Sequence, residues 1–133
     1  SDDNLRLLAI LKHFQGNSGT IHKLEDGVLK LQAVGPGMPD VVLEKIKTIP
    51  VGKGMAGLAV ERNAPVDSCN IQKDDSGDVM PGAKATQLNG SIVVPIQDST
   101  GKAIGALGIG TLSERTFTKE EIDELVECGK LIA

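Results

Sequence analysis

The chain contains no tryptophan and no tyrosine, and apart from histidine its only aromatic side chains are Phe14 and Phe117. Proteins that hold bases or quaternary ammonium groups commonly stack them on aromatic rings, so this sequence offers few sites of that kind. Basic residues are also too few for a basic stripe, because 14 Lys and Arg stand against 18 Asp and Glu, a formal net charge of −4. Direct binding of nucleic acid is therefore not expected.

Cysteine is scarce as well: Cys69 and Cys128 are the only two, and no C-x-x-C pair occurs. This count does not suit a disulfide-stapled secreted domain, and it predicts two reduced structural thiols. The sequence also lacks a run of about eighteen apolar residues and a basic leader followed by an apolar stretch. We therefore expect no membrane partner and a cytoplasmic location.

The length of 133 residues suits one domain with a single sizeable core. The first segment, DDNLRLLAILKHFQG, predicts a helix that ends near Gly16. Two apolar stripes run along this helix, one made by Leu7, Ile10, Leu11 and Phe14 and the other by Leu5 and Leu8. Their combined width exceeds what one core face needs, which indicates that a second helix, from another subunit, covers the excess.

The middle of the chain predicts short strands and short helices. Residues 20–35, TIHKLEDGVLKLQAVG, form two alternating runs around a D-G turn, the pattern of a β-hairpin. Residues 41–50 predict a helical turn and then an extended piece, and residues 57–63 predict a short helix that stops at Asn63. Further strands are expected in segments 65–70, 91–96 and 103–110.

The last helix is predicted by its start. Thr118 and Glu121 fit a capping box, and Phe117 with Ile122 fits the hydrophobic staple. The order of helix, two strands, irregular crossover, strands and helix predicts an α+β fold. In it an antiparallel sheet carries the terminal helices on one face and loops on the other.

Residues 52–57, GKGMAG, match the G-x-G-x-x-G fingerprint of dinucleotide-binding folds, and Asp74 follows at about the spacing of a ribose-binding acid. The context does not fit. The preceding segment KIKTIP alternates and ends in Pro50, and Pro65 starts the next strand too soon for a βαβ crossover. We interpret the glycines as a tight turn that leads into a short helix.

Several motifs in order resemble the GAF domain family: IPVGKGMAGLAVERNAPV, SIVVPI, GKAIGALGIG and FTKEEIDEL. The resemblance covers nearly the whole chain and implies a single GAF domain over 1–133. It also implies a PAS-like antiparallel sheet of about five to six strands, with the N- and C-terminal helices on one face. A ligand cavity on the other face would be covered by the helix GMAGLAVERN and the segment 70–90.

One branch of the family, the free methionine-(R)-sulfoxide reductases, is catalytic. In that branch a cysteine stands in the glycine turn, where this chain has Ala56, and the catalytic cysteine stands where this chain has Lys84. Pocket acids are replaced by Ser91, Gly108 and Gly110. Because reduction of a sulfoxide needs a thiolate and a resolving thiol, we expect no catalytic residues here, and the reductase is the third-ranked hypothesis.

Cofactors remain unknown from the sequence. His22 is expected to be a solvated or hydrogen-bonded residue of the first strand, and neither histidine neighbours a cysteine, as a bilin site commonly requires. The segment DDSGD lacks the alternating ligands and closing glutamate of an EF-hand, so no metal site is expected.

The leading hypothesis is non-covalent binding of a small ligand, for which an anion is one candidate. Lys84 would be its cationic partner. The central strand faces the cavity either with Ser91 and Val93 or with Ile92 and Val94. The predicted ligand-binding residues are Met55, Leu58, Asn70, Asp74, Met80, Lys84, Thr86 and Ser91.

The resemblance implies a sensor that signals through paired helices. We expect a homodimer whose seam is formed by the terminal helices, with Leu5, Leu8, Ile122 and Leu125 in contact. The alternative from a different class is a protein-interaction module that dimerises in the same way and holds no ligand.

Overall fold

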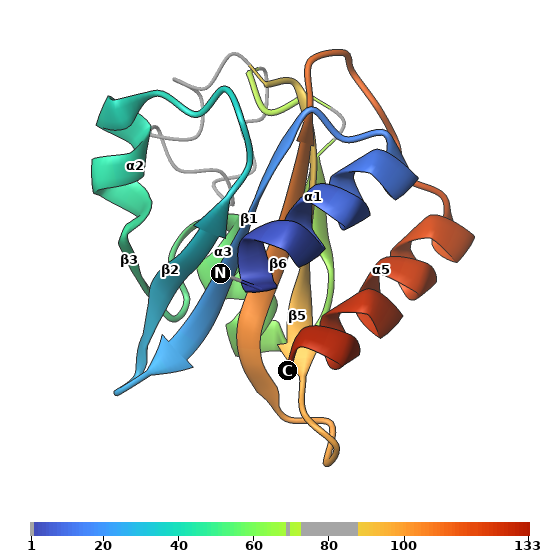
Figure 1. Cartoon of the computed structure of the whole chain (residues 1–133). Helices are drawn as coiled ribbons and strands as arrows, with labels where there is room; N and C mark the ends of the chain where they lie inside the picture. Colours follow the sequence, from blue (N-terminus) through green and yellow to red (C-terminus); the bar gives the residue numbers. More distant parts are fainter. Residues whose placement is uncertain (1, 69, 73–87) are drawn as a thin grey trace.

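A computed structural model describes residues 2–68, 70–72 and 88–133 of the chain (Figure 1). Its elements, in chain order, are α1 Asp2–Phe14, β1 Ser18–Glu25, β2 Val28–Val34, α2 Asp40–Ile46, β3 Thr48–Pro50, α3 Gly54–Arg62, β4 Val66–Ser68, β5 Gly90–Gln97, β6 Ala103–Thr111 and α5 Lys119–Ile132. None of the helices in this part of the chain is long and apolar enough to cross a bilayer.

The strands form one six-stranded sheet in the order β3-β2-β1-β6-β5-β4, and every neighbouring pair is antiparallel. The predicted hairpin is the β1–β2 pair. Strands β1 and β6, which are far apart in the sequence, pair at the centre of the sheet. The predicted α+β fold is confirmed. The dinucleotide interpretation is excluded, because β3 before the glycines and β4 after α3 lie at opposite edges of the sheet, and the described strands form no parallel βαβ unit.

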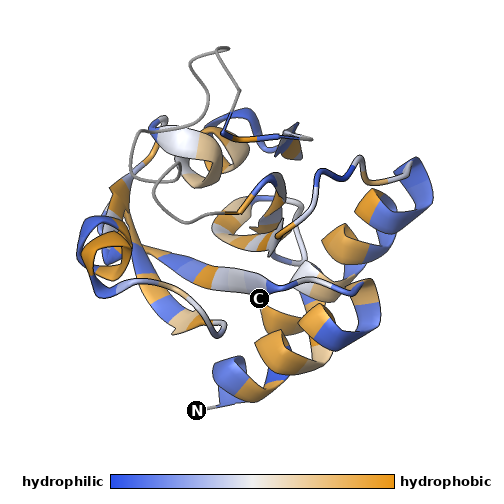
Figure 2. Cartoon of the chain, turned by 90° about the horizontal axis from the view of Figure 1, so that it is seen from above, coloured by the Kyte–Doolittle hydropathy of each residue, from blue (hydrophilic) through white to orange (hydrophobic). Residues whose placement is uncertain are grey.

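The sheet separates two apolar layers. Helices α1 and α5 lie side by side on one face, whereas α3 lies on the other (Figure 1). Leu7, Phe14 and Leu125 belong to the buried cluster on the first face, and Met55 and Ala59 to the cluster on the second. In Figure 2 both terminal helices carry hydrophobic residues on one side and hydrophilic residues on the other, as amphipathic helices on a sheet do.

Helix α5 begins as its sequence predicts. The Thr118 side chain accepts a hydrogen bond from the backbone N–H of Glu121, whose carboxylate accepts one from the Thr118 N–H. The guanidinium of Arg115 donates to the Phe14 carbonyl (2.7 Å), pairs with Glu121 (2.6 Å) and lies over the Phe117 ring. Arg115 therefore joins the end of α1 to the start of α5, a role that the sequence did not reveal.

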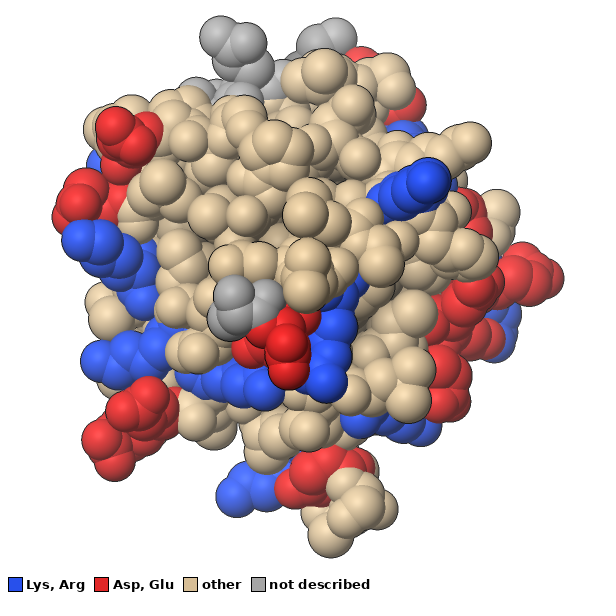
Figure 3. Space-filling view, in the orientation of Figure 1, with Lys and Arg blue, Asp and Glu red and all other residues tan. Residues whose placement is uncertain are grey.

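The outer surface of this layer carries charges of both signs. Figure 3 shows lysine and arginine interspersed with aspartate and glutamate on this face. Along α5, Lys119 pairs with Asp123 and Lys130 with Glu127. Such exposed pairs contribute little to stability, and their main effect is to keep this surface polar.

The three glycines of residues 52–57 serve the turn between β3 and α3. Gly52 and Gly54 have positive φ angles of 90° and 63°. At Gly57 a Cβ atom would lie only 2.5 Å from the Pro50 carbonyl oxygen and 3.0 Å from the Gly52 nitrogen. The Gly52 N–H donates to the Gly57 carbonyl (2.9 Å), and α3 ends at Asn63 in the left-handed region (φ 50°). The interpretation of a tight turn that leads into a short helix is confirmed.

We predict that Gly57→Ala destabilises the protein by about 1–3 kcal/mol, because the new methyl group meets backbone atoms that cannot move aside. The matched control is Gly129→Ala in α5, where the nearest atom would lie 3.5 Å away. There the usual gain in helix propensity, about 0.5–1 kcal/mol, is expected. Urea unfolding measures the change in the free energy of unfolding for each variant. Equal effects of the two substitutions would contradict the close-approach argument.

Candidate functional site

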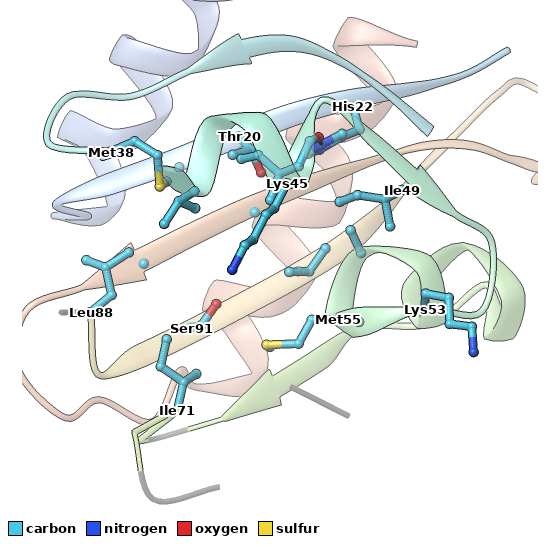
Figure 4. Close-up of a pocket in the computed structure, with 18 of the residues that line it drawn as sticks. Thr20, His22, Met38, Lys45, Ile49, Lys53, Met55, Ile71, Leu88 and Ser91 are labelled. Atoms are coloured by element: carbon cyan, nitrogen blue, oxygen red, sulfur yellow. Dashed lines mark hydrogen bonds between the residues drawn. The ribbon is translucent and has the colours of Figure 1, made fainter. Parts of the chain in front are cut away.

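A cavity of about 360 Å³ lies between the sheet and the two short helices α2 and α3. This volume is at the lower end of the range typical of small-molecule sites, roughly 300–1,000 Å³. Its lining is mostly apolar, and it draws on β1, β5, β6, α2, β3 and α3 (Figure 4). The described residues that line it include Thr20, His22, Met38, Val42, Lys45, Lys53, Met55, Ala56, Ile71, Leu88, Ser91, Val93, Gly108 and Gly110.

Alternation along the strands determines which side chains face the cavity. Ser91 and Val93 line it, whereas Ile92 and Val94 are fully buried in the cluster beneath the terminal helices. This settles the alternative that the sequence left open. On β6, Gly110 and Gly108 stand opposite Ser91 and Val93. Because these glycines carry no side chain, neighbouring side chains approach the strand closely: a Cβ atom at Gly110 would lie 2.5 Å from Leu88, and one at Gly108 would lie 3.3 Å from the Thr20 hydroxyl oxygen.

His22 is the buried polar residue of the cavity wall, with 1% of its surface exposed. Its Nε2 lies 2.8 Å from the Ile46 carbonyl oxygen, which can only accept, so Nε2 carries the proton and donates. Its Nδ1 is buried and has no partner among the described residues. Burial lowers the pKa of His22, and the bond to Ile46 opposes this only in part. The ring is thus buried and neutral, with its donor Nε2–H satisfied and its acceptor Nδ1 without a partner among the described residues, and it is not solvated.

Two lysines line the cavity in different ways. Lys45 projects from α2 into the space beside Ser91, whereas the Lys53 side chain points away from Lys45 at the far end (Figure 4). No described residue forms a hydrogen bond or an ion pair with the Lys45 ammonium. Among the described residues that line the cavity, none is acidic. The described lining therefore carries only positive formal charge.

The sequence-predicted residues divide into three groups. Met55 and Ser91 line the cavity. Leu58 and Asn70 are described but are not among its lining residues: Leu58 packs half-buried on α3, and the Asn70 side chain donates to Glu114. Four predicted residues lie outside the described part of the chain, namely Asp74, Met80, Lys84 and Thr86. Ligand contact by all eight stays a prediction.

Sequence reasoning missed Thr20, Val42, Lys45 and Leu88, which come from three segments. For Thr20 a signal existed, because alternation along the first strand places it on the side opposite Ile21. Val42 and Lys45 lie one turn apart on α2, a spacing that puts both on one side of a helix. Nothing in the sequence says which side of so short a helix meets the sheet.

The described residues offer no alternative chemistry at this site. Within those ranges, no group of three His, Cys, Asp or Glu side chains could hold a metal ion. Cys128 lies on α5, on the face of the sheet opposite the cavity, and burial and the nearby Glu124 raise the pKa of its thiol. A thiolate at Cys128 is therefore disfavoured. Cys69 lies outside the described residues.

A family model of the GAF domain matches residues 6–133. The type II free methionine-R-sulfoxide reductase from Thermoplasma acidophilum has TM-score 0.80 at 23% identity, covering 99% of this chain and 87% of that one. The GAF domain from the Acinetobacter phosphoenolpyruvate-protein phosphotransferase has TM-score 0.76 at 18% identity, covering 95% and 74%. The free methionine-R-sulfoxide reductase from Neisseria meningitidis, in complex with its substrate, has TM-score 0.74 at 20% identity, covering 95% and 70%. At these identities the likeness shows the fold alone. No curated protein sequence matches the chain.

The lowered pKa of His22 predicts a loss of stability in mild acid. Below about pH 6.5 the unfolded chain takes up a proton at His22 that the folded chain resists, so the free energy of unfolding falls as the pH falls. The slope from this one group is at most about 1.4 kcal/mol per pH unit. The measurement is urea unfolding from pH 7.5 to 5.5, with His22→Gln, which keeps a donor but does not titrate, as the comparison. If the wild type and His22→Gln lose the same stability between pH 7.5 and 5.5, His22 is not the cause of the loss.

Proposed function

The chain belongs to the GAF domain family, and from this premise we propose that it is a sensor module that binds a small molecule non-covalently. The observation that carries the proposal is the cavity of about 360 Å³, which side chains of the described residues leave unfilled. Apolar walls with a few polar groups are the usual composition of a small-molecule site. An interaction module without ligand has no need of such a space.

The second candidate, a sulfoxide reductase, is favoured by the likeness in fold to two such enzymes. The residues argue against it. Ala56, Gly108 and Gly110 line the cavity, and none of them supplies a thiol or an acid. Cys128 lies on the opposite face of the sheet, so it does not reach a substrate in the cavity. Because the described lining residues include no thiol, binding without turnover accounts better for this part of the site.

We predict that a thermal-shift screen of anions, nucleotides and amino-acid derivatives identifies a compound that stabilises the protein. A ligand present at a hundred times its Kd adds about 2.7 kcal/mol to the stability of the folded state. Ala56→Phe places a ring in the cavity and should abolish the shift while the apo protein still unfolds cooperatively. Native mass spectrometry of gently purified protein tests for a ligand carried along.

Free methionine sulfoxide belongs in the same screen, with formation of methionine followed as a second readout. Binding of some compound without methionine formation is the expected result. If no compound shifts the transition and no bound species is found, the sensor proposal is wrong. Turnover that is lost in Cys69→Ser would establish the reductase instead.

We further propose that two copies of the chain associate through α1. Leu5 and Leu8 are 69% and 51% exposed, although they are large apolar side chains on the same helix. Ile122 is half-buried at the start of α5. Leu125 has 1% of its surface exposed because it packs in the core of its own chain, so it is not available to a partner. The proposed dimer interface therefore keeps Leu5, Leu8 and Ile122 and leaves out Leu125.

We predict that Leu8→Lys yields monomers in light scattering and leaves the unfolding transition of the fold intact, since the side chain contributes little to the core. Val41→Lys is the matched control, because Val41 is 59% exposed on the separate helix α2. A parent protein that is already monomeric removes the basis of the dimer proposal. Equal dissociation by both substitutions would point to a different interface.

A further inference from the structure

We propose that the ligand of this cavity is an organic monoanion, a carboxylate on an apolar body, and that Lys45 is its counter-ion. The inference rests on the proposed binding function and gives it a chemical class. It follows from the distribution of charge along the cavity wall, from the number of polar groups there and from the way α2 is held.

The charge of the described cavity wall favours an anionic ligand. The charged side chains among the described lining residues are two lysines, and neither aspartate nor glutamate accompanies them. Moving a carboxylate out of water is costly unless it is paired, and a cationic ligand here would meet an uncompensated like charge. Lys45 has no ion-pair or hydrogen-bond partner among the described residues, so its ammonium is free to take a ligand oxygen.

The small number of polar groups on the described wall favours a carboxylate over a phosphate. Beside Lys45, the hydroxyl groups of Thr20 and Ser91 offer hydrogen bonds to a carboxylate (Figure 4). No arginine lines the described wall. Thr48 adds a third hydroxyl group, His22 Nε2 already donates to Ile46, and Lys53 points away from Lys45. Most of the other large lining side chains are apolar, among them Met38, Val42, Met55, Ile71 and Leu88. A phosphate carries more charge and accepts more hydrogen bonds than this set can satisfy. A ligand with one carboxylate and an apolar chain matches the polar and apolar groups of the described cavity wall.

Helix α2, which carries Lys45 near its end, is anchored to the sheet. The carbonyl of Ile46, the next residue, accepts from His22 Nε2 at 2.8 Å. The carbonyl of Lys47 accepts from the backbone N–H of Leu31 at 2.9 Å. Two bonds from β1 and β2 thus fix the backbone on the C-terminal side of Lys45. Because these bonds hold the backbone at the base of the Lys45 side chain, His22 is a positioning residue for the ammonium. Less conformational entropy is then lost when a ligand binds.

The test uses four probes: hexanoate, hexanamide, hexylamine and inorganic phosphate. Titration calorimetry and ligand-observed NMR should show binding of hexanoate, about tenfold weaker binding of hexanamide, and weaker binding still of hexylamine and phosphate. Affinity for hexanoate should fall as salt is added, whereas affinity for hexanamide should not.

Lys45→Met should lower the affinity for hexanoate about tenfold and leave the affinity for hexanamide unchanged. The two probes should then bind with equal affinity. The matched control is Lys47→Met, which removes the same charge from a residue two positions along, outside the cavity lining, where the lysine pairs with Glu44. It should leave both affinities unchanged. His22→Ala should weaken hexanoate more than hexanamide, which a purely structural loss would not do.

Hexanamide binding as tightly as hexanoate overturns the inference, and so does phosphate binding more tightly or a Lys45→Met protein that still prefers hexanoate. In each of these cases the cavity still binds a ligand, so the sensor proposal stands. If none of the four probes binds and the wider screen also finds nothing, both proposals fall together.

Discussion

The alternation of side chains along β6 is the constraint on which the rest of the structure depends. Successive residues of a strand point to opposite faces. On β6 this puts Leu107 and Ile109 in the fully packed layer under the terminal helices. The residues between and beyond them, Gly108 and Gly110, face the other side and line the cavity. One strand therefore supplies large core side chains to one face of the sheet and residues without side chains to the cavity wall on the other.

Sequence patterns predicted the elements whose signals are local. The capping box at Thr118 and the D-G turn of the first hairpin depend on residues a few positions apart, and both appear in the structure. The cavity was predicted only in outline, because it forms where distant segments meet. The bond from His22 to Ile46 that seats α2 spans 24 positions. Hence Lys45 was missed, while Lys84, chosen from the family resemblance, lies outside the described residues.

Proteins with different names and activities share this fold, so the GAF fold does not specify one kind of chemistry. Fold likeness at 23% identity extends over 99% of this chain to a protein named as a sulfoxide reductase. Here Ala56 and two glycines line the cavity, and among the lining residues that the structure describes there is neither a thiol nor a carboxylate. Both faces of the sheet carry a buried apolar cluster, and the cavity lies beside the cluster on the α3 side. The fold therefore does not by itself decide the chemistry of the residues that line the cavity.

Strand β1 belongs to both layers at once. Thr20 and His22 line the cavity, and the residue between them, Ile21, is fully buried in the cluster under α1. A ligand that alters β1 therefore acts on the same backbone that supports the exposed leucines of α1. If association uses that helix, occupancy and assembly are thermodynamically reciprocal: the dimerisation constant depends on ligand concentration, and the apparent ligand affinity depends on protein concentration.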